Sequence, residues 1–147
     1  MRFNLLIILF FACASKVEEE AKISICPVEN GTFGPRFYPM FVHRGPDYSV
    51  HRVLIKGKLG DEVYAVSDGI IERISPKTGR LLIKNNDLTF TYLYFFCLNP
   101  SVKEGKRVKV GDVLGTLEYL EFIRFSIEKN GEIIPVGDYI ECQSFKW

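Results

Sequence analysis

Turn-forming residues recur at short intervals along this chain and restrict the length of any regular element. Ser67-Asp68-Gly69, residues 76–79 and residues 85–87 each end a short apolar stretch, and such clusters of Gly, Pro, Asn and Asp mark turns. After the N-terminal segment, no window of about 11 residues or more has a sustained helical period with caps. The pattern therefore predicts an all-β fold of short strands, with little or no helix.

The clearest turn signal is Asn130-Gly131. This dipeptide favours a two-residue hairpin turn, so Phe122–Lys129 and Glu132–Ile134 should pair as antiparallel strands. Further strands are expected at residues 62–66, 70–74, 81–84 and 113–117.

An aromatic segment at residues 88–98 predicts one long strand. Because side chains alternate between the two faces of a strand, we expect one face to hold Phe90, Tyr92, Tyr94 and Phe96. The simplest interpretation is a packed sheet face. Tyr94 and Phe122 could also lie on the floor of a groove that holds a sugar or a peptide without cutting it.

The N-terminal segment has the pattern of a secretory signal. Residues 5–11 form an apolar run after Arg2, and this run is shorter than the roughly 20 residues that span a bilayer. Ala12-Cys13 resembles a bacterial lipobox, in which Cys13 would be lipidated; plain secretion and an uncleaved anchor are the alternatives. We expect a location in the bacterial cell envelope, periplasmic or outward-facing, with the membrane reached through the lipid. The expected parts are a signal peptide at residues 1–12, a solvated tether at 13–30 and a β domain at 31–147.

Charge and histidine content exclude several classes of function. The 147 residues suit one domain, and 19 Lys and Arg balance 18 Asp and Glu, for a net charge of +1. No excess of cations is available to neutralise phosphates, so a nucleic-acid partner is not expected. The chain has only two histidines, His43 and His51, which excludes any mechanism that needs three or more.

The cysteines leave two interpretations open. Cys26 and Cys142 flank the domain and could pair in an oxidising compartment. Equally, Cys26, Cys97 and Cys142 could be free thiols that pack as small apolar side chains. No CxxC is present, which excludes zinc-ribbon and thioredoxin-type sites.

Residues 102–115 carry the sharpest local pattern, V-x-x-G-x-x-V-x-x-G-x-x-x-G. Its glycines permit positive φ at turns between very short strands. Such a pattern occurs in barrel-sandwich hybrid folds, which include biotinyl and lipoyl carriers. A carrier lysine usually has Met or Asp-Ala beside it, and Lys77, which lies in a turn, has neither. The pattern therefore indicates a fold and disfavours a carrier.

Five ordered segments together carry a family pattern. They are Phe33-Gly34-Pro35-Arg36 with Pro39, His43 to Tyr48, Val63 to Ile71, Thr91 to Phe95 and Phe122 to Ile127. In this order and spacing they resemble the LytM/lysostaphin-type zinc metallopeptidases, which cut peptide cross-links in bacterial peptidoglycan. The likeness covers about residues 31–141. It implies a LytM-type β-sheet core related to the barrel-sandwich hybrid.

The resemblance also implies a zinc site and assigns its positions. In the family, a His and an Asp of the second segment and one His of the last segment hold zinc. Two further histidines act on the bound water and the substrate. Carried over by position, the remaining ligands are His43 and Asp47, and the third ligand position is Arg124. The two catalytic positions are occupied by Tyr94 and Phe122.

These substitutions predict an empty metal site and no catalytic residue. A catalytic zinc needs about three protein ligands with lone pairs, whereas an arginine guanidinium stays protonated and has no acceptor. Glu118 is a weak substitute ligand, and strand alternation turns Glu121 to the opposite face. We therefore expect no cofactor. One hypothesis pairs Arg124 with Asp47, so that a tethered cation replaces the metal; the alternative is a remnant hydrogen-bonded pair.

The expected function is that of a catalytically inactive LytM-type envelope lipoprotein. Its partner would be peptidoglycan or a peptidoglycan hydrolase such as an amidase, which it would regulate. The alternative is an active zinc endopeptidase with a rearranged metal site. A passive wall-binding module is a further possibility that the residues leave open.

Overall fold

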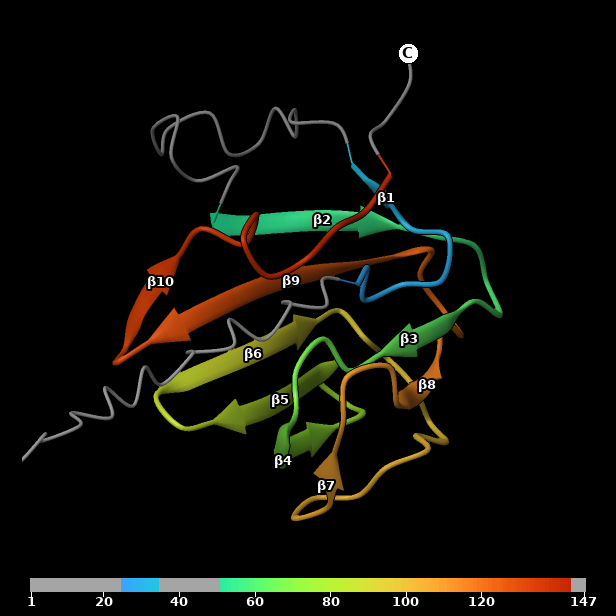
Figure 1. The fold of residues 1–147 in the computed structure, drawn as a ribbon. Coiled ribbons are helices and arrows are strands. Elements are labelled where there is room, and N and C mark those ends of the chain that lie inside the picture. Colours follow the sequence, from blue (N-terminus) through green and yellow to red (C-terminus); the bar gives the residue numbers. More distant parts are fainter. Residues whose placement is uncertain (1–24, 35–50, 144–147) are drawn as a thin grey trace, which may run out of the picture.

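Ten β-strands make up nearly all the regular structure of the computed structural model, which describes residues 25–34 and 51–143 (Figure 1). The expectation of an all-β fold is confirmed. The strands are β1 Thr32–Phe33, β2 Arg52–Lys56, β3 Glu62–Tyr64, β4 Gly69–Ser75, β5 Arg80–Asn85, β6 Leu88–Leu93, β7 Arg107–Val108, β8 Val113–Thr116, β9 Phe122–Lys129 and β10 Glu132–Ile134.

A large antiparallel sheet carries eight of these strands in the order β1-β2-β9-β6-β5-β4-β7, with β10 also paired to β9. β3 and β8 form a separate two-stranded sheet. The longest strand, β9, lies between β2 and β6 (Figure 1). Residues on β9 therefore have neighbours on both sides, and this position makes β9 the strand on which a site can be built.

Alternation along β9 separates a buried face from a polar one. Ile123, Phe125 and Ile127 are fully buried, and they pack with side chains of β5 and β6 in the main hydrophobic core. We call this side of the large sheet the inner face. Phe122 and Arg124 alternate with these residues and are only partly buried, so they lie on the opposite side, the outer face.

The predicted hairpin at Asn130-Gly131 is confirmed. β9 and β10 pair antiparallel, with Lys129 opposite Glu132. The two turn residues have φ values of 52° and 82°, which a two-residue turn of this type requires at both positions. Asparagine and glycine adopt such values at the lowest cost, so the local sequence determines the register of this hairpin.

β6 is shorter than the sequence predicts, because the strand ends at Leu93. Tyr94 has a φ of 62°, and Phe95 donates its N–H to the carbonyl of Gly79 at 2.9 Å. Phe95 is buried, whereas Tyr94 is 39% exposed. The prediction that Tyr94 shares a face with Phe90 and Tyr92 is therefore wrong, since the alternation is broken at Tyr94.

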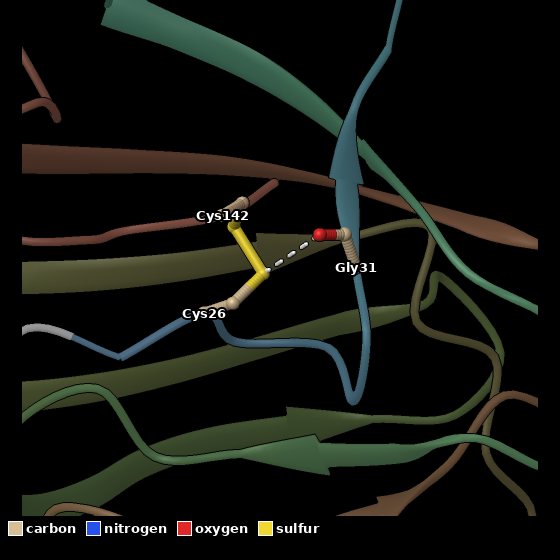
Figure 2. Close-up of a disulfide and its surroundings, with 3 residues drawn as sticks. All are labelled: Cys26, Gly31 and Cys142. Atoms are coloured by element: carbon tan, nitrogen blue, oxygen red, sulfur yellow. Dashed lines mark hydrogen bonds between the residues drawn. A yellow bond between two sulfur atoms is a disulfide. The ribbon is translucent and has the colours of Figure 1, made fainter. Parts of the chain in front are cut away.

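A disulfide joins Cys26 to Cys142, across 116 residues of sequence (Figure 2). This decides between the two interpretations of the cysteines, and Cys97 remains a buried free thiol. The Cys26 Sγ lies 3.7 Å from the carbonyl oxygen of Gly31; because a disulfide sulfur carries no proton, this is a packing contact. Residues 25–30, part of the expected tether, pack on the domain, and Val28 is fully buried beside Val63.

Candidate functional site

Tyr94, Phe122 and Arg124 form one cluster on the outer face. Phe122 and Arg124 alternate along β9, and Arg124 pairs with Leu93, the residue before Tyr94. The ring centroids of Tyr94 and Phe122 are 6.0 Å apart at an interplanar angle of 66°. The guanidinium carbon of Arg124 lies 5.7 Å from the centroid of the Tyr94 ring. The structure thus brings together the three positions that the family resemblance selected.

The chemistry of this cluster is aromatic and cationic. An edge-to-face pair of rings and a guanidinium over a ring are both attractive, each contributing about 0.5–1.5 kcal/mol. The Arg124 guanidinium has no lone pair to offer, and a phenylalanine ring has none either. These residues do not fit a zinc ion, because the third ligand position supplies a guanidinium in place of an imidazole nitrogen. The two catalytic positions supply only the Tyr94 hydroxyl.

The backbone of Tyr94 is strained. A bulky residue with φ near +60° is rare and costs about 1–3 kcal/mol, so the surrounding structure must hold it there. The bond from the Phe95 N–H to Gly79 and the burial of Phe95 do this from the next residue. The conformation turns the Tyr94 side chain out of the core and toward Phe122 and Arg124.

Tyr92, two residues earlier, is anchored in the core instead. Its hydroxyl donates to the carbonyl of Tyr64 at 2.8 Å and accepts from the N–H of Val66 at 3.1 Å. Burial raises the pKa of this hydroxyl far above its usual value. Tyr92 therefore joins the large sheet to the segment that follows β3.

Glu118 joins the segment after β8 to the segment after β6, and it belongs to no group of possible metal ligands among the described residues. Its carboxylate accepts the N–H of Leu98 at 3.0 Å and the thiol of Cys97 at 3.3 Å. The bond from Leu98 lowers the pKa of Glu118, and burial raises the pKa of Cys97. The sequence gives no sign that Leu98 and Tyr119 are 61% and 58% exposed, because loop positions carry no periodic signal.

Three predicted site residues, His43, Asp47 and Cys13, lie outside the described residues. The pairing of Arg124 with Asp47 therefore stays a prediction. Within residues 25–34 and 51–143, no group of three or more His, Cys, Asp and Glu side chains is placed to hold a metal. His51 is partly buried directly before β2. Over the same residues, no helix has the length and apolar character to cross a membrane.

The fold and the position of the cluster define an M23-type peptidase domain. The family model described as "Peptidase family M23" matches residues 48–134, which is more than half of the chain. This chain belongs to peptidase family M23. No curated protein sequence matches it significantly.

Solved structures support the same fold. Helicobacter pylori Csd3 in its orthorhombic crystal is 25% identical, with a TM-score of 0.60, over 84% of this chain and 36% of that chain. Its hexagonal crystal gives 23% identity, a TM-score of 0.62 and coverages of 81% and 33%. Lysostaphin from Staphylococcus simulans is 21% identical, with a TM-score of 0.53 and coverages of 73% and 48%. The chain thus spans about a third of the Csd3 length and about half of the lysostaphin length.

Proposed function

We propose that this chain is a non-catalytic M23 domain of the bacterial cell envelope that binds peptidoglycan or regulates a peptidoglycan hydrolase such as an amidase. The observation that carries the proposal is the Tyr94–Phe122–Arg124 cluster. Each member replaces a histidine that the family resemblance implies at that position, and the Tyr94 ring contacts both Phe122 and Arg124.

The charge of Arg124 supports the loss of metal-dependent chemistry. A guanidinium stays protonated at any physiological pH and repels a dication that approaches the same position. Family members use a bound zinc to lower the pKa of water, which makes water a nucleophile at neutral pH. With a cation in that position, the fold keeps its large sheet and has no group there to activate water.

The aromatic side chains support a binding role. Tyr94 and Tyr119 are exposed at the same end of the large sheet, and the contact of Glu118 with Leu98 holds their loops together. Exposed aromatic rings present an apolar surface with a polar edge. Such a surface suits the sugar rings or the stem peptide of peptidoglycan, or a side chain of a partner protein.

The disulfide supports an extracytoplasmic location. Disulfides persist in oxidising compartments and are rare in the cytosol, and the Cys26–Cys142 bond joins parts of the fold far apart in sequence. We include in the proposal a signal at residues 1–12 and lipidation of Cys13, which together would anchor the chain to a membrane.

The test measures metal content, wall lysis and wall binding on the same full chain. We expect substoichiometric zinc after purification with zinc present, no lysis of purified peptidoglycan, and either sedimentation with the sacculi or capture of a wall hydrolase. About one zinc per chain together with lysis would overturn the proposal and favour the active endopeptidase. Loss of both kinds of binding would overturn the binding role.

A matched variant restores the family residues. We expect Tyr94→His/Phe122→His/Arg124→His to bind zinc more tightly than the parent chain by at least about tenfold, because Arg124→His restores the third ligand position and removes a cation. The other two substitutions restore the catalytic positions. Phe122→Leu is the control, since it changes the cluster without adding a ligand. Equal zinc binding by the parent and the triple variant would contradict the role assigned to Arg124.

A further inference from the structure

Cations gather at one end of the large sheet, although the chain as a whole is almost neutral. Residues 68–84 and 103–112 contain eight Lys and Arg but only four Asp and Glu. The rest of the chain contains 11 Lys and Arg and 14 Asp and Glu. These segments form β4, β5 and β7 with their loops, in the lower part of Figure 1. We call this the basic sheet end. Its cations are Arg73, Lys77, Arg80, Lys84, Lys103, Lys106, Arg107 and Lys109, all of them exposed.

Three of the four carboxylates of this region accept backbone N–H groups, and the fourth, Glu72, is exposed on β4. Asp68 accepts the N–H of Val110 at 2.9 Å, and Asp112 accepts the N–H of Lys109 at 2.9 Å. Glu104 accepts a backbone N–H of β4 at 3.0 Å. The ion pair found among the described residues joins Lys129 to Asp87, which both lie outside the basic sheet end. The basic sheet end therefore presents positive charge to solvent.

Strand pairing places an apolar side chain in the centre of these cations. Ile70 on β4 lies opposite Lys84 on β5 and, on its other side, opposite Arg107 on β7. Ile70 is 42% exposed, one of the few large apolar side chains so exposed. Neighbouring strands are about 4.8 Å apart, so Lys84 and Arg107 flank Ile70 at a backbone separation of about 10 Å.

We propose that the basic sheet end docks an acidic segment of a protein partner, with carboxylates on Lys84 and Arg107 and an apolar side chain on Ile70. Arginine binds carboxylates in a bidentate geometry. Side chains of an extended peptide alternate between its two faces, so glutamates at positions i and i+4 share a face with a leucine at i+2. At about 3.3 Å per residue the two glutamates lie about 13 Å apart, within reach of the long Lys84 and Arg107 side chains. Inorganic polyphosphate supplies charge but nothing for Ile70. This inference goes beyond the proposed function and does not rest on the Tyr94–Phe122–Arg124 cluster.

The test uses a short fluorescent peptide with glutamates two residues before and two residues after a leucine, so that all three side chains share one face of the extended peptide. The matching glutamine peptide is the control. The full chain should bind the acidic peptide at low salt, and its affinity should fall as salt screens the charges. Lys84→Glu/Arg107→Glu should lose at least about tenfold in affinity, since two attractive contacts become repulsive. Ile70→Thr, which keeps a β-branched side chain, should lose about threefold.

A control variant separates a specific surface from net charge. Lys56→Glu/Lys58→Glu changes the charge by the same amount at exposed positions outside the basic sheet end, and it should bind the peptide nearly as the parent does. An equal loss of affinity for the acidic peptide in both double variants would overturn the inference. It would also be overturned if the chain bound polyphosphate or phosphatidylglycerol vesicles and Ile70→Thr bound them with the same affinity as the parent. The zinc and wall measurements are independent of these results, so the two proposals can fail separately.

Discussion

The inner and outer faces of the large sheet are built from alternate residues of the same strands, yet they obey different constraints. On β9 the inner residues Ile123, Phe125 and Ile127 are fully buried. Because the core is close-packed, a change in the volume of any of these side chains disturbs its packing. The outer residues Phe122 and Arg124 are partly exposed, and each of them contacts Tyr94. The comparison teaches that the residues of the family site can be exchanged without loss of the fold.

The largest expected effect comes from the inner face. Phe125→Ala removes a fully buried ring that contacts Phe90 and Tyr92. We expect the free energy of unfolding to fall by about 3–5 kcal/mol, measured by urea denaturation. A loss below about 1 kcal/mol would mean that the inner face is not the core of the domain.

The disulfide should rank next, because it attaches residues 25–30 to the side of the sheet where the core lies. Cys26→Ser/Cys142→Ser should lower the free energy of unfolding by about 2–5 kcal/mol, since the unfolded chain loses a long covalent loop. The parent chain under reducing conditions is the matched control and should unfold at the same denaturant concentration. A double variant as stable as the oxidised parent would contradict the pairing.

A smaller loss is expected from the hydroxyl of Tyr92. Tyr92→Phe keeps the ring and leaves the N–H of Val66 without its partner, which should cost about 1–3 kcal/mol. Thermal or urea unfolding at neutral pH measures this loss in the free energy of unfolding. An unchanged midpoint would show that the link between the large sheet and the segment after β3 contributes nothing to stability.

The same residue predicts an alkaline effect. Burial raises the pKa of Tyr92 above the usual 10.0, so this group's contribution to stability is complete below that pH. Above it, the unfolded chain ionises Tyr92 and the folded chain does not, so stability falls as the pH rises. Tyr92→Phe should show a shallower decline in the free energy of unfolding above about pH 10 than the parent. Parallel declines would contradict this origin.

The smallest effect should come from the outer face. Arg124→Ala removes a guanidinium stacked on Tyr94, and we expect a loss of about 1 kcal/mol or less. Calorimetric unfolding of this variant beside Phe125→Ala measures the contrast between two adjacent residues of one strand. Equal losses would contradict the comparison, because the outer face would then carry as much of the stability as the core.

Much of the fold follows from local patterns, and the largest departure comes from a nonlocal contact. β9, β10 and the turn at Asn130-Gly131 have the predicted bounds, because turn chemistry and alternation agree there. The extended aromatic strand was predicted too long. Alternation continues past Leu93 in the sequence, but the bond from Phe95 to Gly79 ends the strand. No pattern within the segment encodes that partner.

The sequence predicts one of the two proposed sites and gives no sign of the other. Ordered segments predicted that Tyr94, Phe122 and Arg124 would fill the family positions, and the structure places the three together. No sequence pattern reveals the basic sheet end, because its cations come from two segments that only the pairing of β4 with β7 unites. The balanced total charge conceals this local excess.

The bond between Cys26 and Cys142 has a mechanical consequence. Tension applied between the chain before Cys26 and the chain after Cys142 runs through two sulfur atoms and bypasses the 115 residues between them. Pulling in this direction cannot peel the strands apart one by one, because none of them lies on the loaded path. A protein held at one end against a moving wall would keep its sheet intact under such a load.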